Sequence, residues 1–265
     1  MLEIKNISKT FNAGTVNEKK ALRGLSLTLN DGDFVTVIGG NGAGKSTLLN
    51  AISGVWPIDE GHIIIDGKDV TKLPEYRRAA FLGRVFQDPM NGTAATMGIE
   101  ENLALALRRG SRRTLRIGIK NSERELYRDW LKRLGLGLED RLTSKVGLLS
   151  GGQRQALTLL MATLQRPKLL LLDEHTAALD PKTAKKVLDL TAEIVEEQKL
   201  TTLMITHNMK DAIQLGNRLI MMHEGNVIFD VAGDKKKNLT VEDLLHKFEE
   251  ASGEEFANDR MMLTK

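Results

Sequence analysis

The sequence predicts an α/β fold with a block of helices inserted into it, and three observations lead to this prediction. Residues 34–38 form a β-branched run that leads through a glycine-rich stretch into a helical pattern. Strand and helix patterns alternate again from residue 169 to residue 231, which is typical of a largely parallel sheet. Between these parts, residues 88–165 have the periodicity of helices alone. We therefore expect an α/β core that is interrupted by a helical subdomain.

Five strands and one helix are expected before the helical block. The strand segments alternate with period two or are rich in β-branched residues, and they lie at residues 2–7, 25–29, 34–38, 62–67 and 81–86. The helix begins at Lys45, after the glycine-rich stretch, and ends near Gly54 and Pro57, which are typical of a helix C-terminus. Residues 12–20 are polar and are expected to form an insertion after the first strand.

The second half of the chain follows the same alternation. In the helical block, the best candidates are helices at residues 99–107, 123–134 and 150–164. The core then resumes with a strand at 169–173, a helix at 183–198, a strand at 202–206, a helix at 208–215 and a hairpin formed by 219–223 and 227–231. Thr240 opens a capping-box pattern for a further helix, and residues 252–265 are expected to form a loosely held tail.

Composition limits the classes of protein to consider. Lys and Arg exceed Asp and Glu by 38 to 35, a small excess that does not indicate a dedicated nucleic-acid binder. The chain has no cysteine, which excludes disulfides, a thiol nucleophile and thiolate metal sites. Its N-terminus lacks the layout of a secretory signal, and its apolar runs are far shorter than the roughly 20 residues that span a bilayer. We expect a cytoplasmic protein that reaches a membrane only through a partner.

Residues 39–46 match the phosphate-binding pattern G-x-x-x-x-G-K-[ST]. In this pattern the glycines allow backbone N–H groups to surround phosphate oxygens, the lysine reaches the outer phosphates, and the serine hydroxyl binds magnesium. The N-terminus of the following helix adds positive potential. A simple glycine-rich turn is the alternative, but the strand before it and the helix after it favour the phosphate-binding loop. The expected nucleotide contacts are Gly39, Gly40, Asn41, Gly42, Ala43, Gly44, Lys45, Ser46 and Thr47.

A second motif, Leu149-Ser150-Gly151-Gly152-Gln153, lies in the helical block. Four further landmarks accompany the two motifs, namely Gln87, the apolar run 169–172 that ends in Asp173-Glu174, Ala178-Leu179-Asp180, and His207. Because these motifs and landmarks occur together and in this order, the chain resembles the ATP-binding cassette (ABC) family of ATPases over nearly its whole length. The resemblance implies a P-loop NTPase core with an inserted α-helical subdomain and an N-terminal antiparallel β subdomain.

The resemblance also implies how the chain is divided. Residues 1–232 would form the cassette, and residues 233–265 a C-terminal helical extension and tail. Within the cassette, the nucleotide-binding core would comprise 1–87 and 166–232, and the helical subdomain 88–165.

ATP and Mg²⁺ are the ligands that the resemblance implies. Mg²⁺ would be held by Ser46, Gln87 and Asp173, the last of these through water. Glu174 would be the catalytic base that polarises the attacking water, and His207 would contact the γ-phosphate. Gln87 would be the third catalytic residue; it ends its strand at the junction with the helical block, where it would contact magnesium or water and report the nucleotide state to that block. The signature would face the ATP of a second protomer through Ser150, Gly151, Gly152 and Gln153, with Asp180 in the same interface.

Three further features are open at this stage. Phe11 occupies the place where such cassettes put an aromatic ring against adenine, although core packing is an alternative. His175 stands where a proline usually follows the catalytic glutamate, which leaves the turnover rate in question. A basic cluster forms either a solvated face or a contact with anionic headgroups or a permease loop; its residues are Arg108, Arg109, Arg112, Arg113, Arg116 and Lys120.

The resemblance favours the ATPase subunit of a membrane transporter. ATP would close a homodimer of cassettes, and the helical subdomain would pass the motion to separate integral membrane permease subunits. The chain would then be a peripheral subunit on the cytoplasmic side of the cell membrane. Segments 148–157 and 173–176 resemble binding-protein-dependent bacterial importers, some linked to amino acids including tryptophan, so an extracytoplasmic solute-binding protein is expected and nucleic acid is not. A soluble, permease-free ATPase of the iron–sulfur cluster assembly type is the alternative.

Overall fold

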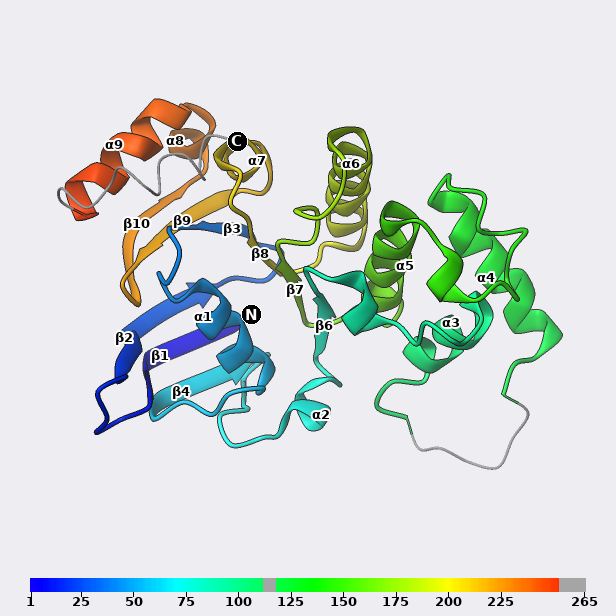
Figure 1. Cartoon of the computed structure of the whole chain (residues 1–265), viewed down its shortest axis with the longest axis horizontal. Coiled ribbons are helices and arrows are strands. Elements are labelled where there is room, and N and C mark those ends of the chain that lie inside the picture. The colour runs from blue at the N-terminus through cyan, green and yellow to red at the C-terminus, as the bar shows by residue number, and fades with distance from the viewer. Residues whose placement is uncertain (112–117, 253–265) are drawn as a thin grey trace.

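The computed structural model describes residues 1–111 and 118–252, so all but the first residue of the expected tail lies outside them. Figure 1 shows the arrangement. The strands are β1 (Leu2–Phe11), β2 (Lys19–Leu29), β3 (Phe34–Ile38), β4 (Glu60–Ile65), β5 (Lys68–Asp69), β6 (Leu82–Val85), β7 (Leu169–Asp173), β8 (Thr202–Ile205), β9 (Arg218–His223) and β10 (Asn226–Ala232). The helices are α1 (Lys45–Ser53), α2 (Glu75–Arg78), α3 (Ile99–Leu107), α4 (Asn121–Arg133), α5 (Gly151–Thr163), α6 (Pro181–Gln198), α7 (Met209–Gln214), α8 (Asp234–Lys237) and α9 (Val241–Ser252), with 3-10 turns at Pro89–Gly92 and Val146–Leu148.

Two sheets form the α/β part of the molecule. The larger sheet has the order β10-β9-β3-β8-β7-β6, in which only β10 runs antiparallel to its neighbour. The smaller sheet has the order β2-β1-β4-β5 and is antiparallel. This matches the P-loop core and the N-terminal antiparallel subdomain expected from the sequence. Parallel strands are covered on both faces, which explains why β3 and most of β7 are buried apolar runs.

The main hydrophobic core lies between the two sheets. Helix α1 contributes Leu48, Leu49 and Ile52 to it, and the sheets contribute strand residues such as Val37 from β3 and Leu171 from β7. The glycine-rich loop follows β3 directly, so it lies at the carboxyl ends of the strands of the larger sheet. The buried helix α1 holds it there.

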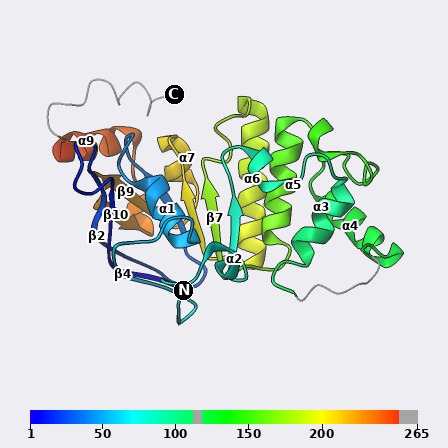
Figure 2. The same cartoon turned by 60° about the horizontal axis from the view of Figure 1, so that its bottom comes forward.

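The helical block lies at the other end of the molecule from α9 and β10 (Figure 1). It has its own core, to which Leu103 of α3, Leu131 of α4 and Leu157 of α5 contribute. Figure 2 shows β7, α6, α5 and then α3 and α4 side by side, so α5 joins this block to the α/β part. Within the described ranges, no helix has the length and apolar character needed to cross a bilayer.

The first two strands differ from their expected length. Strand β1 continues to Phe11 and β2 begins at Lys19, so the polar insertion is limited to residues 12–18. Their pairing has register shifts after Ile4, Ile7 and Lys9. Bulges of this kind interrupt the alternation of inward and outward side chains, which is why a period-two pattern does not reveal the whole strand.

Candidate active site

The glycine-rich loop runs from the end of β3 to the start of α1, and two of its glycines are required by close backbone contacts. A Cβ on Gly39, whose φ is +152°, would lie 2.2 Å from the carbonyl oxygen of Met222. A Cβ on Gly44, whose φ is +99°, would lie 2.6 Å from the carbonyl oxygen of Ala21. No other residue type fits these positions, so the path of the loop around the helix N-terminus is fixed by its neighbours.

Lys45 is the first residue of α1 and is only 5% exposed. Its Nζ donates hydrogen bonds to the carbonyl oxygens of Gly39, at 2.6 Å, and Gly40, at 2.9 Å. The ammonium group therefore lies against the loop and next to the backbone N–H groups of the helix N-terminus. This combination of a cation and N–H donors at a helix N-terminus binds phosphate oxygens well.

A pocket of about 280 Å³ lies over this loop. It collects residues from β1, from the start of β2, from the loop and α1, and from the segments that follow β7 and β8. The lining residues are Phe11, Lys19, Ala21, Asn41, Gly42, Ala43, Gly44, Lys45, Ser46, Thr47, Glu174 and His207. Most of the expected nucleotide contacts thus lie in one pocket, together with two of the three expected catalytic residues.

Glu174 and His207 meet because β7 and β8 are parallel neighbours whose carboxyl ends lie at the same edge of the sheet. Nε2 of His207 lies 2.6 Å from Oε1 of Glu174, whose side chain is 12% exposed. The backbone of Glu174 has a φ of +45°, and its N–H donates to the carbonyl oxygen of Ile205. A carboxylate held in this way at a pocket wall can accept a proton from water.

Asp173 closes β7 and is 17% exposed, but it does not line the pocket over the loop. Burial raises its pKa, and Arg84, whose Nη2 lies 3.4 Å from Oδ2, opposes that effect. Arg84 also donates to Oδ1 of Asn50, at 2.8 Å, and to Oγ of Ser53, at 3.0 Å. Arg84 is not among the site residues expected from the sequence, although an arginine inside the apolar strand β6 indicates that it has buried partners.

Gln87 follows β6 at the junction between the core and the helical block, as expected. Next to it, the carbonyl oxygen of Phe86 accepts a hydrogen bond of 3.3 Å from Nε2 of the buried Gln155, which belongs to α5. The end of β6 is therefore hydrogen-bonded directly to α5, the helix that begins within the signature motif.

The expected magnesium ligands fit the chemistry of that ion. Ser46, Gln87 and Asp173 offer a hydroxyl, an amide oxygen and a carboxylate, and Mg²⁺ prefers oxygen ligands. Ser46 lines the phosphate pocket, while Gln87 and Asp173 lie at the ends of the adjacent strands β6 and β7. The described part of the chain has no cluster of three or more His, Cys, Asp or Glu residues that would form an all-protein metal site.

The signature motif lies at the N-terminus of α5 and not at the phosphate pocket of the same chain. Oγ of Ser150 accepts from the backbone N–H of Gln153, and the Gln153 side chain accepts from the N–H of Ser150. A Cβ on Gly152 would lie 2.0 Å from Cγ2 of Thr183, so α5 and α6 are in close contact there. Asp180 caps α6 and accepts from the N–H of Thr183.

Ser150, Gly152 and Gln153 line a separate pocket of about 490 Å³ between α5 and α6. Ser150, Gly151 and Asp180 are exposed. One chain thus presents two distinct surfaces, one with the phosphate loop and the other with the signature.

Phe11 lies on the wall of the phosphate pocket and also packs inside the fold. Its ring centroid is 4.9 Å from that of Trp56 in an edge-to-face arrangement, and Nζ of Lys9 lies 5.6 Å from it. The two readings of Phe11 from the sequence are therefore compatible, because one edge of the ring packs on Trp56 while the side chain remains half-buried in the pocket wall.

His175 is buried behind the catalytic turn. Its Nε2 lies 3.1 Å from Oγ1 of Thr191 in α6, and that hydroxyl donates its own hydrogen to the carbonyl oxygen of Val187 at 2.7 Å. Nε2 must therefore carry the proton, while Nδ1 is buried with no hydrogen-bond partner in the described residues. Burial lowers the pKa of His175 to about 4, so the side chain is neutral at physiological pH.

This burial should make stability depend on pH. An unfolded histidine has a pKa of about 6.5, so between pH 6.5 and 4 the unfolded chain binds a proton that the folded chain excludes. The free energy of unfolding should fall as the pH drops through this window. In His175→Gln, whose amide still donates to Thr191 but does not titrate there, the fall to pH 4 should be smaller by roughly 3 kcal/mol.

Urea unfolding at several pH values between 4 and 7 measures this effect. His246→Gln, which changes an exposed histidine on α9, is the matched control and should keep the slope of the unaltered protein. A His175→Gln protein with that same slope would show that His175 is protonated in the fold.

The basic cluster is only partly described. Nη2 of Arg108 forms an ion pair of 2.6 Å with Oε1 of Glu123, and Nη2 of Arg109 lies 3.5 Å from the carbonyl oxygen of Ala162. Arg112, Arg113 and Arg116 lie outside the described residues. The choice between a solvated face and a headgroup or permease contact stays a prediction.

Comparison with known proteins agrees with this geometry. The family model described as "ABC transporter" matches residues 22–177. A tyrosine transport ATP-binding protein of Clostridioides difficile is 49% identical, with 95% of this chain and 100% of that protein covered. A phosphonates import ATP-binding protein of Lactobacillus johnsonii is 32% identical, with 97% and 100% covered.

Among solved structures, the dimeric post-hydrolysis state of an ATP-binding cassette bound to ADP and Pi has a TM-score of 0.75. It is 30% identical and covers 88% of this chain and 98% of its own. The family match covers more than half of the sequence, and the tyrosine transport ATP-binding protein matches 95% of it. This chain therefore belongs to the ABC transporter family and is an ATP-binding ATPase.

Proposed function

We propose that this chain is the ATP-hydrolysing subunit of a bacterial ABC importer for a small solute such as an amino acid. The observation that supports the mechanism is the placement of the phosphate loop and the signature on separate surfaces of one chain, so that a complete site needs a second copy. The names of the relatives support import, and the relative named for tyrosine transport supports an amino acid as the solute. They do not favour the alternative, an ATPase for iron–sulfur cluster assembly.

Hydrolysis follows from the residues at the pocket. The loop N–H groups and Lys45 hold the phosphates, and Phe11 stacks on adenine. Glu174 orients and polarises a water molecule for attack on the γ-phosphorus, and His207 positions both that carboxylate and the γ-phosphate. Ser46, Gln87 and Asp173 would hold Mg²⁺, Asp173 through water, and the ion would neutralise charge on the phosphates when bound.

The signature completes the site from the other protomer. In a head-to-tail dimer, the hydroxyl of Ser150 and the N–H groups at the start of α5 face the γ-phosphate of the partner's ATP. Asp180 lies in the same interface. ATP thus holds the dimer closed, and hydrolysis releases it.

A mixture of two defective proteins tests this arrangement. Lys45→Ala should prevent phosphate binding at the loop, and Ser150→Arg should obstruct the signature. Each homodimer of one variant therefore has two defective sites. In the mixed dimer, one site combines an intact loop with an intact signature, while the other carries both defects. ATP-dependent association should therefore reappear on mixing, which fluorescence transfer between labelled protomers measures.

Each variant mixed with labelled copies of itself is the control. If the mixture merely averages its two parents, the shared-site arrangement is wrong, and Ser150 acts within its own chain or only as a helix cap. Association is the preferred readout, because hydrolysis can require both sites of a dimer.

The membrane partners are also part of the proposal. The chain lies on the cytoplasmic face of the cell membrane against integral permease subunits, and an extracytoplasmic solute-binding protein delivers the substrate to them. Capture from a detergent extract should recover a multi-span membrane protein. Recovery of soluble scaffold proteins instead would support the iron–sulfur alternative.

A further inference from the structure

We propose that Lys19 is a second cation of the nucleotide site, which contacts the phosphate chain of ATP from the open side of the loop. This inference rests on the ATP site described above and assigns a binding role to a residue outside the phosphate-binding motif. It concerns nucleotide binding alone, so it can be tested apart from transport.

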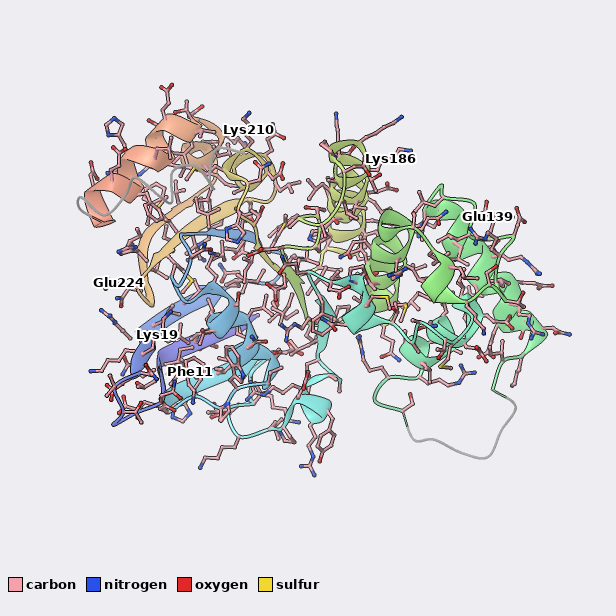
Figure 3. All side chains as sticks on the ribbon, in the orientation of Figure 1. Phe11, Lys19, Glu139, Lys186, Lys210 and Glu224 are labelled. Carbon is pink, nitrogen blue, oxygen red and sulfur yellow. The ribbon has the colours of Figure 1, made fainter. Side chains whose placement is uncertain are left out.

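The first step is the position of Lys19 in the sheet. Lys19 is the first residue of β2 and is directly opposite Phe11, the last residue of β1, whereas Lys20 is opposite Thr10. Residues that face each other across an antiparallel pair share one side of the sheet, and consecutive residues point to opposite sides. Lys19 therefore shares a face with Phe11. Figure 3 shows the two labelled residues close together at this end of the ribbon.

The second step is the distance to the phosphate loop. Both Phe11 and Lys19 line the pocket over the loop, while Lys20 does not. A Cβ on Gly42, at the middle of the loop, would lie 3.2 Å from Nζ of Lys19. The ammonium group of Lys19 thus reaches the backbone whose N–H groups surround the phosphates.

The third step is the electrostatic surroundings. Within the described residues, Lys19 forms no ion pair. The one acidic residue that lines the pocket, Glu174, is paired with His207 at 2.6 Å. The carboxylate of Glu18, the neighbour of Lys19 in sequence, accepts from the backbone N–H of Gly14. The charge of Lys19 is therefore directed at the pocket without a neighbouring carboxylate to neutralise it.

The two lysines have different tasks. Lys45 is buried and bonded to the carbonyl oxygens of the loop, so it shapes the loop as well as the phosphate site. Lys19 is exposed and lies above Gly42, so it can approach the phosphates after the nucleotide has entered. Because the nucleotide would lie between these two cations, its phosphate chain is neutralised from both sides.

The test compares Lys19→Ala with Lys20→Ala, which removes the same charge from the other face of the strand. We expect Lys19→Ala to weaken ATP binding about fivefold, the order of magnitude for one exposed charge pair, and Lys20→Ala to leave it unchanged. Lys19→Arg should restore most of the affinity. Isothermal titration of ATP, ADP, AMP and adenosine without hydrolysis gives the four dissociation constants.

The nucleotide series identifies the contact. The loss should be largest for ATP and absent for adenosine, and it should shrink at high salt, because an exposed charge is screened. Equal losses for ATP and adenosine would show that the stem of Lys19 packs on the base or ribose, and would overturn the proposal. So would a Lys19→Ala protein that binds ATP as tightly as Lys20→Ala. In both cases the importer proposal would stand, because permease capture tests it separately.

Discussion

Replacing Glu174 with glutamine should nearly abolish ATP turnover while ATP binding is retained. The amide has the shape of the carboxylate but lacks the negative charge that polarises water, and loss of such a base costs about a hundredfold or more in rate. Because the product is not formed, the variant should remain as an ATP-bound dimer. Phosphate release measures turnover, and analytical ultracentrifugation with MgATP measures association.

Glu196→Gln is the matched control, since it makes the same exchange at an exposed position of α6 and should change neither quantity. If Glu174→Gln hydrolyses ATP at the normal rate, or stays monomeric with MgATP, Glu174 does not have the assigned role.

Lys45→Ala should act on binding itself. The change removes a buried cation next to the helix N-terminus together with its bonds to the carbonyl oxygens of Gly39 and Gly40. Hydrogen bonds to charged groups contribute about 1.5 to 3 kcal/mol, so ATP affinity should fall about ten- to a hundredfold. Calorimetric titration measures the affinity, and thermal unfolding checks that the protein remains folded.

Lys45→Met separates the effect of the lost charge from that of the lost side-chain volume, because methionine keeps most of the volume without the charge. A methionine variant as impaired as the alanine variant would attribute the loss to charge. Unchanged ATP affinity in both variants would contradict the role of Lys45.

The sequence was most informative where a local pattern and the fold agree. The helix Lys45–Ser53 lies between Gly44 and Gly54, both with positive φ, and the structure confirms both of its ends. The helix Ile99–Leu107 and the strand Leu169–Asp173 also have the expected bounds. In each case, apolar residues lie at the period of one kind of element, and a break in the pattern marks its end.

The sequence was least informative where contacts between residues far apart in the chain determine the structure. The extra length of β1 and β2 depends on bulged pairing, and the short helices Glu75–Arg78 and Asp234–Lys237 have too few residues to show a period. The order of the motifs predicted the phosphate pocket, but not the position of Lys19, because that depends on the pairing of Lys19 with Phe11. The partner of His175 likewise follows from the packing of α6, and no local signal points to Thr191.

The contact between His175 and Thr191 has a mechanical consequence. Helix α6 extends over 18 residues from its cap at Asp180, and Thr191 lies about three turns along it. In the proposed dimer, the Asp180 end of this helix would face the second protomer, while its middle is hydrogen-bonded to His175, the neighbour of Glu174. A displacement of Asp180 would then be transmitted along α6 to the turn that carries Glu174.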